Sequence, residues 1–178
     1  TREEAKIYDN FHIEIFNRYE NKLTQRDVDF IKNLFPVNKS IKLLDLGCGT
    51  GNISLRFLND KRFYITAVDL SPEMLKIFKD KVKKEDIDRC KLVCKTIEEF
   101  LEENTQEYDI IAINSVLHHL YEPYKTIEKM LKMVKDRGVV YIGHEPIHGD
   151  LSQESKSILI RIIQILDRVF SNLYYCLL

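Results

Sequence analysis

Three glycines at every second position, Gly47, Gly49 and Gly51, directly follow a short apolar run that ends at Leu46. Glycine lets the backbone turn sharply at the end of a strand and leaves no Cβ between the chain and a ligand. A helix that follows such a loop presents unpaired N–H groups at the same point. The pattern therefore predicts a loop that binds a nucleotide-containing cofactor. The dinucleotide fingerprint needs a glycine where this chain has Asn52, which disfavours a dinucleotide oxidoreductase.

The segment from Asp45 to Gly51 resembles the first motif of the class I S-adenosylmethionine-dependent methyltransferases. The resemblance covers about residues 40–146 and implies a Rossmann-like fold. It implies S-adenosyl-L-methionine as cofactor, with S-adenosyl-L-homocysteine as the product. By the same resemblance, the cofactor would lie against Asp45, Gly47, Cys48, Gly49 and Gly51.

A further acidic residue, Asp69, ends the next apolar run, where nucleotide folds place the carboxylate that accepts ribose hydroxyls. Ser71 and Pro72 then form a helix N-cap and a first helical residue. The resemblance implies that Asp69 binds the ribose and that Leu70 and Met74 lie beside the cofactor. In the alternative interpretation, Asp69 is a solvated strand-end residue and Met74 fills the core.

Two further pairs complete the expected cofactor site. After the third strand the family often has an Asp that recognises adenine, but this chain has none there, so Thr96 and Ile97 would contribute backbone groups instead. Asn114 and Ser115 follow the fourth apolar run, at the edge of a parallel sheet where ligands bind. We expect all four residues to line the cofactor site.

His118, His119 and Glu145 are the candidates for a catalytic base. The segment from Val116 to Leu120 resembles the branch of the family that acts on small molecules. Enzymes that methylate base amines carry an Asn/Asp-Pro-Pro-aromatic tetrad here, which this chain lacks. Each histidine could instead cap a helix or form the pocket wall, and Glu145 could be solvated or ion-paired. The remaining histidines show no metal-ligand spacing, so no metal site is expected.

The expected reaction is an in-line displacement that moves a methyl group to an oxygen, nitrogen, carbon or sulfur atom of a small or medium-sized molecule. Proximity and orientation supply most of the rate in such a reaction. A base is needed only if the acceptor carries a proton near neutral pH. Two alternatives are a non-catalytic S-adenosylmethionine-binding subunit or sensor, and a methyltransferase acting on transfer or ribosomal RNA.

The elements that must position these residues alternate between strand-length apolar runs and amphipathic segments, as in a mostly parallel, doubly wound α/β sheet with helices on both faces. The expected strands are 41–46, 63–69, 91–95, 108–114 and 139–144. Helices are expected to begin near positions 51, 72, 97, 122 and 152. In the turn before the fifth strand, Gly138 is expected to supply the backbone geometry that ends the preceding helix.

Residues 1–40 are expected to form a helical cap, and residues 41–178 the cofactor-binding core. Helical patterns run over 5–19 and over 24–34, the second opened by Thr24. Tyr19, with other aromatic residues of the first pattern, could close over the cofactor as part of a lid.

The C-terminal part departs from the family, because the antiparallel strands six and seven are not visible in it. Residues 152–178 instead predict one long helix with a broad apolar face. Such a face needs covering. Either a missing C-terminal part or the partner in a homodimer would cover it.

Composition favours one soluble domain. The chain has 178 residues, 44% of them hydrophobic, and a formal net charge of −1. This balance gives no electrostatic reason to expect nucleic acid as a partner, and no apolar run is long enough for a membrane span. The four cysteines lack paired spacing, which fits a reducing compartment. We therefore expect a cytoplasmic protein with a small-molecule methyl acceptor.

Overall fold

The computed structural model describes residues 18–145 and 160–163; side chains are described for residues 21–145. The strands are β1 (Ile41–Leu46), β2 (Phe63–Asp69), β3 (Cys90–Cys94), β4 (Tyr108–Asn114), β5 (Val134–Gly143) and β6 (Ile160–Ile163). The helices are α2 (Arg18–Asn33), α3 (Asn52–Leu58), α4 (Pro72–Lys81), α5 (Ile97–Glu103) and α6 (Pro123–Met133), with the short 3-10 helices η1 (Lys84–Arg89) and η2 (Leu117–His119).

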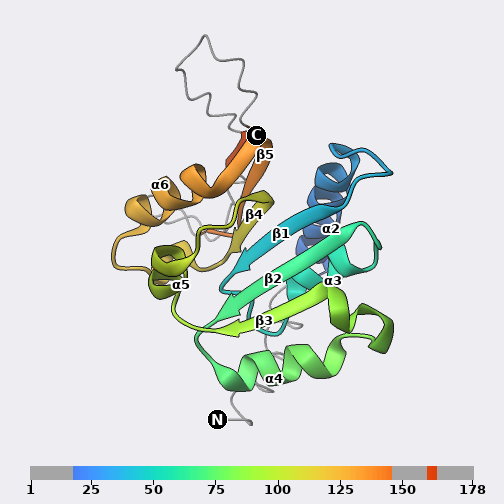
Figure 1. Cartoon of the computed structure of the whole chain (residues 1–178), viewed down its shortest axis with the longest axis horizontal. Coiled ribbons are helices and arrows are strands. Elements are labelled where there is room, and N and C mark those ends of the chain that lie inside the picture. Colours follow the sequence, from blue (N-terminus) through green and yellow to red (C-terminus); the bar gives the residue numbers. More distant parts are fainter. Residues whose placement is uncertain (1–17, 146–159, 164–178) are drawn as a thin grey trace.

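The strands form one sheet in the order β3-β2-β1-β4-β5-β6 (Figure 1). The first five are parallel, and β6 pairs with β5 in the antiparallel direction. The order reverses between β1 and β4, and their carboxyl ends meet at one edge, where ligands bind in such sheets. The expected doubly wound α/β fold is thereby confirmed.

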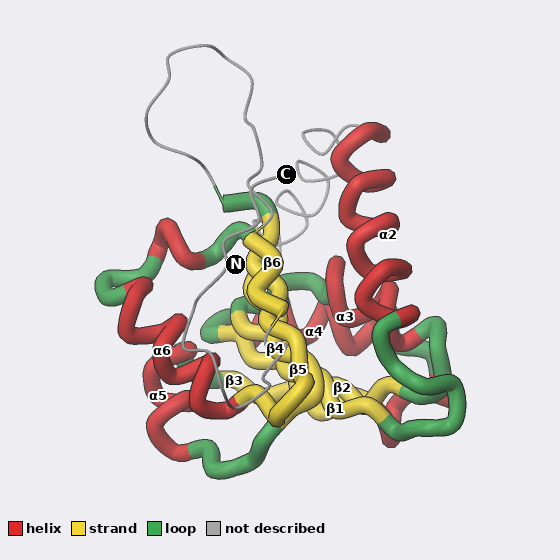
Figure 2. Tube along the Cα trace, turned by 90° about the horizontal axis from the view of Figure 1, so that it is seen from above, coloured by secondary structure: helices red, strands yellow, loops and turns green. Residues whose placement is uncertain are grey.

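Successive residues of the central strands point to opposite faces of the sheet, so each strand contributes side chains to two hydrophobic cores. Leu43 packs in one core with residues of α2, α3 and α4. Leu44 packs in the other with residues of α5 and α6. Figure 2 shows these two groups of helices on opposite sides of the strands. Because both faces are covered, β1 and β4 are buried along nearly their whole length.

The N-terminal helix differs from the expectation. Thr24 does not open a helix, because α2 already includes Arg18 and continues to Asn33. Thr24 is buried inside α2, and its Oγ1 lies 2.8 Å from Nε2 of His144. The hydroxyl therefore joins two elements far apart in the sequence rather than capping its own. Most of the first helical pattern lies outside the described residues.

The C-terminal expectation is also corrected. A single helix over 152–178 is wrong, because residues 160–163 form β6. Three of these four residues are isoleucine, a β-branched type that favours strands. The outer edge of β5 offers unpaired backbone groups that such a segment satisfies. The chain therefore does contain an antiparallel strand beyond β5. The other residues from 146 onward lie outside the described part.

The last parallel strand begins earlier than expected, at Val134 rather than at position 139, so Arg137 and Gly138 lie inside β5, where its register with β4 shifts, and not in a turn before it. Gly138 does not supply the left-handed residue; Arg137 does, with φ 63°. A Cβ on Gly138 would lie 2.5 Å from Val134 Cγ2 and 2.9 Å from the carbonyl oxygen of Asp109. Gly138 is thus required by close packing, and the strained conformation falls on its neighbour.

Candidate functional site

The glycine loop between β1 and α3 is fixed by the neighbouring strand. The N–H groups of Gly47 and Cys48 both donate to the carbonyl oxygen of Val68, at 2.8 and 3.0 Å. All three loop glycines have positive φ, which other residues rarely adopt. The loop therefore has one defined shape at the carboxyl edge of the sheet.

The three glycines serve different purposes. A Cβ on Gly47 would lie 2.6 Å from a methyl group of Val116, and one on Gly51 would lie 2.4 Å from the ring of Phe78. These two positions are needed for packing. A Cβ on Gly49 would meet nothing within 4 Å. Gly49 therefore leaves open space above the loop among the described residues.

Asp69 ties this loop to the start of α4. Its Oδ2 accepts a hydrogen bond from the N–H of Gly49 at 2.7 Å, and its Oδ1 accepts one from the N–H of Ser71 at 2.9 Å. Ser71 in turn accepts from the N–H of Met74, as an N-cap followed by Pro72 should. Each carboxylate oxygen can accept a second hydrogen bond, as a ribose hydroxyl would require.

Asp45 is the buried acid of the loop. Its carboxylate is almost fully enclosed and accepts a hydrogen bond from Ser54 Oγ at 2.6 Å. Burial raises the pKa of Asp45 to about 6, against the opposing effect of the Ser54 hydrogen bonds, and the charge of Asp69 raises it further. A bound cation would offset this cost.

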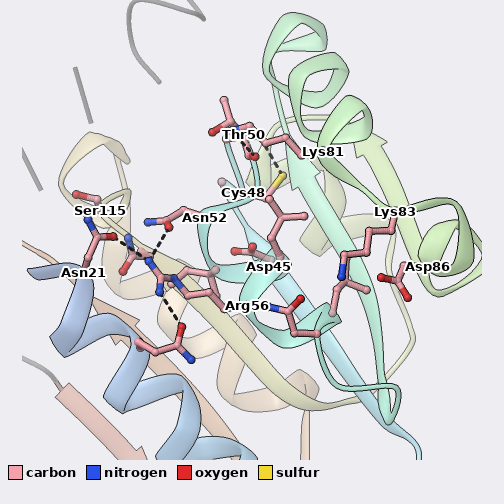
Figure 3. Close-up of a pocket in the computed structure, with 18 residues that line it drawn as sticks. Asn21, Asp45, Cys48, Thr50, Asn52, Arg56, Lys81, Lys83, Asp86 and Ser115 are labelled. Atoms are coloured by element: carbon pink, nitrogen blue, oxygen red, sulfur yellow. Dashed lines mark hydrogen bonds between the residues drawn. The ribbon is translucent and has the colours of Figure 1, made fainter. Parts of the chain in front are cut away.

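A cavity of about 620 Å³ lies over the glycine loop and α3 (Figure 3). Of the predicted cofactor residues, six line it: Asp45, Gly47, Cys48, Gly49, Asn114 and Ser115. Six others do not line it: Gly51, Asp69, Leu70, Met74, Thr96 and Ile97. The side chain of Tyr19 lies outside the described part. The cavity thus brings together one half of the predicted site.

The residues outside the cavity follow β2 and β3 at the same sheet edge. Leu70 is largely exposed, with 72% of its surface accessible, and Met74 is half-buried. Thr96 caps α5 reciprocally with Glu99, so both its hydroxyl and its N–H have partners within the helix. Ile97 is buried. Thr96 and Ile97 thus contribute to the local fold, one through the helix cap and the other through its buried side chain.

Two polar side chains of the cavity wall, Cys48 and Asn114, differ in whether they can bind a ligand. Burial raises the pKa of the Cys48 thiol, so the sulfur is neutral and unreactive. The Oδ1 atom of Asn114 is buried and has no hydrogen-bond partner among the described residues. Together with Asp45 and the open space at Gly49, this acceptor fits a ligand that carries ammonium and hydroxyl groups.

Glu145 and His118 form a pair in the segments that follow β5 and β4, and neither of them lines the cavity. The Glu145 carboxylate accepts hydrogen bonds from the N–H groups of residues 116, 117 and 118, and lies 2.8 Å from Nδ1 of His118. Burial alone would raise the pKa of Glu145, but these hydrogen bonds lower it below its ordinary value. Glu145 is therefore a poor proton acceptor that fixes η2. The ring of His119 lies 3.9 Å from that of His118, between centroids.

Sequence reasoning missed one group on the α2 side of the cavity. Arg56 on α3 reaches α2 and binds Asn21 and Gln25, which also line the cavity. An arginine in an amphipathic helix carries no signal of its own, because a solvent-facing arginine is the ordinary case. The cluster of Arg56 with Asn21 and Gln25 is recognised only from the packing of α2 on α3.

The described residues contain no metal-ligand cluster, no membrane-spanning helix and no disulfide. Residues 18–145 and 160–163 contain no cluster of three His, Cys, Asp or Glu side chains that could hold a metal. Across the same ranges, no helix is long and apolar enough to span a membrane. The described cysteines, Cys48, Cys90 and Cys94, form no disulfide.

Comparison with known proteins identifies relatives. A family described as "Methyltransferase domain" matches residues 37–161. A malonyl-[acyl-carrier protein] O-methyltransferase of Priestia megaterium is 38% identical over 104 residues, which cover 57% of this chain and 35% of that protein. The chain spans less than half the length of the first curated relatives it matches.

Solved structures share the fold at low sequence identity. The plantazolicin methyltransferase BpumL, in complex with SAH, aligns with a TM-score of 0.63 and 19% identity, over 79% of this chain and 52% of that one. The [4+2]-cyclase SpnF aligns with a TM-score of 0.56 and 23% identity, over 71% and 49%. Proteins named for different reactions thus have this fold, and the fold alone does not determine the chemistry.

Proposed function

The chain belongs to the methyltransferase domain family, and on that premise we propose that it binds S-adenosylmethionine and transfers the methyl group to a small or medium-sized molecule. The name of the Priestia megaterium relative supports an oxygen atom as the acceptor. When bound, the cofactor supplies a methyl group on a positively charged sulfur, which the acceptor displaces in line.

Three side chains would hold the cofactor. Asp69 would accept ribose hydroxyls on the oxygens that already bind Gly49 and Ser71. Asp45 and Asn114 would accept hydrogen bonds from the ammonium end, since one is a buried carboxylate and the other a buried unpaired carbonyl. These groups orient the cofactor, and orientation supplies most of the rate in such a transfer.

His118 is the residue proposed to receive a proton from an acceptor that carries one. With the Nδ1 proton directed at Glu145, Nε2 is the ring nitrogen that can accept a second proton. Glu145 would then act through His118 as a positioning residue, because its own oxygens are occupied. His119 would support the ring of His118 by contact.

The proposal depends most on one observation: the Asp69 carboxylate holds the N–H of Gly49, the loop residue above which the structure leaves open space. Isothermal titration calorimetry with S-adenosylmethionine and S-adenosylhomocysteine tests it, comparing the wild type with Asp69→Ala. Glu107→Gln, which removes an exposed carboxylate at the opposite end of the sheet, is the matched control. We expect binding by the wild type and the control, and loss of binding in Asp69→Ala.

A folded wild-type chain that binds neither compound would contradict the proposal. Binding without methyl transfer to any acceptor in a screen of alcohols, phenols, carboxylates, amines and thiols would favour the non-catalytic sensor instead. Transfer to RNA alone would favour the RNA methyltransferase.

A further inference from the structure

Arg56 is a half-buried cation in the cavity wall, held by two helices (Figure 3). Its Nη1 atom donates to Oε1 of Gln25 at 2.8 Å. Its Nη2 atom donates to Oδ1 of Asn21 at 2.9 Å and to Oδ1 of Asn52 at 3.3 Å. All three acceptors are neutral carboxamide oxygens. They fix the position of the guanidinium group without neutralising its charge.

The described residues place no carboxylate within ion-pair distance of Arg56. Asp29 lies one turn along α2 from Gln25, and its negative charge raises the pKa of Arg56 only through a longer-range electrostatic interaction. In addition, the Nε atom of Arg56 is buried and has no hydrogen-bond partner in the described part of the chain. With respect to the described residues, the guanidinium group of Arg56 therefore has an uncompensated charge and one N–H donor that is not used.

Two other arginines with little exposed side-chain surface, Arg62 and Arg89, differ from Arg56 because each forms an ion pair. Arg62 pairs with Asp60 at 2.7 Å, and Arg89 pairs with Asp86 at 2.5 Å. Both of these pairs serve to hold backbone segments together through the carbonyl groups they also bind. Where an arginine has a structural role here, an acid of the chain itself neutralises it. Among residues 21–145, whose side chains are described, Arg56 has no such acid.

An unneutralised, partly desolvated cation is unfavourable until an anion completes its environment. Desolvation accordingly lowers the pKa of Arg56. A guanidinium group suits a carboxylate, to which it donates charge-assisted hydrogen bonds. Nη1 of Arg56 keeps one N–H group for such a bond, because only its other proton is used by Gln25. The same cavity is lined by the acid Asp45. A small molecule with both an ammonium and a carboxylate group would find opposite charges in one cavity.

We propose that Arg56 binds the carboxylate of a small molecule in this cavity, with Asn21, Gln25 and Asn52 as its positioning residues. The inference rests on the proposed function. The carboxylate has two sources: the amino-acid end of the cofactor, or the methyl acceptor. The three carboxamide side chains fix the guanidinium group in one position, and because they are neutral they leave its positive charge available to a carboxylate.

The test compares two ligands that differ in this group. S-adenosylhomocysteine carries the carboxylate, whereas 5′-methylthioadenosine keeps the nucleoside and the thioether but lacks the amino-acid part. Each is titrated by calorimetry into the wild type, Arg56→Gln and Arg56→Lys. If the cofactor supplies the carboxylate, Arg56→Gln binds S-adenosylhomocysteine about tenfold to a hundredfold more weakly and binds 5′-methylthioadenosine unchanged. Arg56→Lys, which keeps the charge, recovers part of the loss.

If the acceptor supplies the carboxylate, both nucleosides bind Arg56→Gln as they bind the wild type. Malonate titrated into the S-adenosylhomocysteine complex then binds the wild type and not Arg56→Gln. Unchanged nucleoside binding together with no difference in malonate binding would overturn the inference. Equal losses for both nucleosides would also overturn it, because they would show that Arg56 only packs α2 on α3.

Failure of the wild type to bind either nucleoside would count against the proposed function rather than against this site. Malonate titrated into the free protein then decides the inference by itself. Binding that requires Arg56 supports it, and binding that is absent or unaffected by Arg56→Gln contradicts it.

Discussion

The carboxylate of Glu145 lies 2.8 Å from Nδ1 of His118 while it also accepts the N–H groups of three consecutive residues that lead into η2. One acid at the end of β5 thus shapes the turn after β4 and orients the imidazole that this turn carries. The pair joins two strand ends that are neighbours in the sheet.

Replacing Glu145 with Gln should destabilise the fold by about 1 to 3 kcal/mol at pH 7, because an amide cannot accept all of these hydrogen bonds. The pKa of Glu145 is lowered in the fold from its ordinary value of 4.5. Its contribution to stability is therefore complete above that pH and is lost as the pH falls through the folded pKa. Urea unfolding between pH 3 and pH 7 should show a smaller acid loss in Glu145→Gln.

Glu128→Gln, on the exposed face of α6, is the control for this measurement and should follow the wild type. Equal acid losses in the wild type and Glu145→Gln would refute the assigned role of the carboxylate.

Asp45→Asn should stabilise the protein above pH 6. Burial raises the pKa of Asp45 from 3.8 to about 6, so the folded state holds this proton more tightly than the unfolded state. Wild-type stability therefore falls as the pH rises from about 4 through 6, by up to about 3 kcal/mol from this group. Thermal unfolding across this range should show the fall in the wild type and not in Asp45→Asn. Asp136→Asn, an exposed change, should leave the wild-type profile intact.

Alanine at Gly49 and at Gly51 should give opposite results. Gly51→Ala would place a methyl group 2.4 Å from Phe78, so we expect a loss of stability of about 1 to 3 kcal/mol. Gly49→Ala meets no atom and costs only the strain of its positive φ, about 1 kcal/mol. Calorimetry should nevertheless show that Gly49→Ala binds S-adenosylhomocysteine much more weakly, because the methyl group enters the open space. Normal binding by a folded Gly49→Ala variant would argue against a ligand above the loop.

The first half of β5, where its register with β4 shifts, offers a matched pair of changes. Gly138→Ala should destabilise the protein, because its methyl group would lie under 3 Å from three atoms, two of them backbone carbonyl oxygens. Arg137→Gly should be neutral or stabilising by up to about 1 kcal/mol, because it relieves a positive φ. Denaturant titrations of both variants check this. A larger loss in Arg137→Gly than in Gly138→Ala would reverse the assignment.

The strands could be predicted because local signals define them. The bounds of β1, β2 and β4 agree with the prediction, since each apolar run ends at a glycine or at polar residues. β3 is shifted by one residue, and β5 begins at Val134 rather than at the predicted position 139. The predictions failed where a distant contact decides the structure. Thr24 resembles an N-cap until α2 is seen to continue through it to reach His144. Ile160–Ile163 has helical spacing until the edge of β5 accepts it as a strand.

The candidate site also contains residues that could be predicted from local motifs and residues that could not. The glycine loop, Asp45 and Asp69 are contiguous motifs whose spacing carries the information, and the cavity brings Asp45 and the loop together. The four hydrogen bonds of Glu145 and the carboxamide contacts of Arg56 depend on residues that are neighbours only after the sheet and α2 have formed. No spacing in the sequence encodes them.

The central position of β1 has a consequence for synthesis of the chain. Because β1 pairs with β4, with Leu43 opposite Ile110, one edge of the first strand stays open until the ribosome has released the fourth. Until then the nascent chain exposes an unpaired edge with apolar residues on both sides, which is a template for aggregation. The glycine loop at the end of β1 differs in this respect, because the groups that hold it, the carbonyl of Val68 and the carboxylate of Asp69, belong to β2 and emerge before β4.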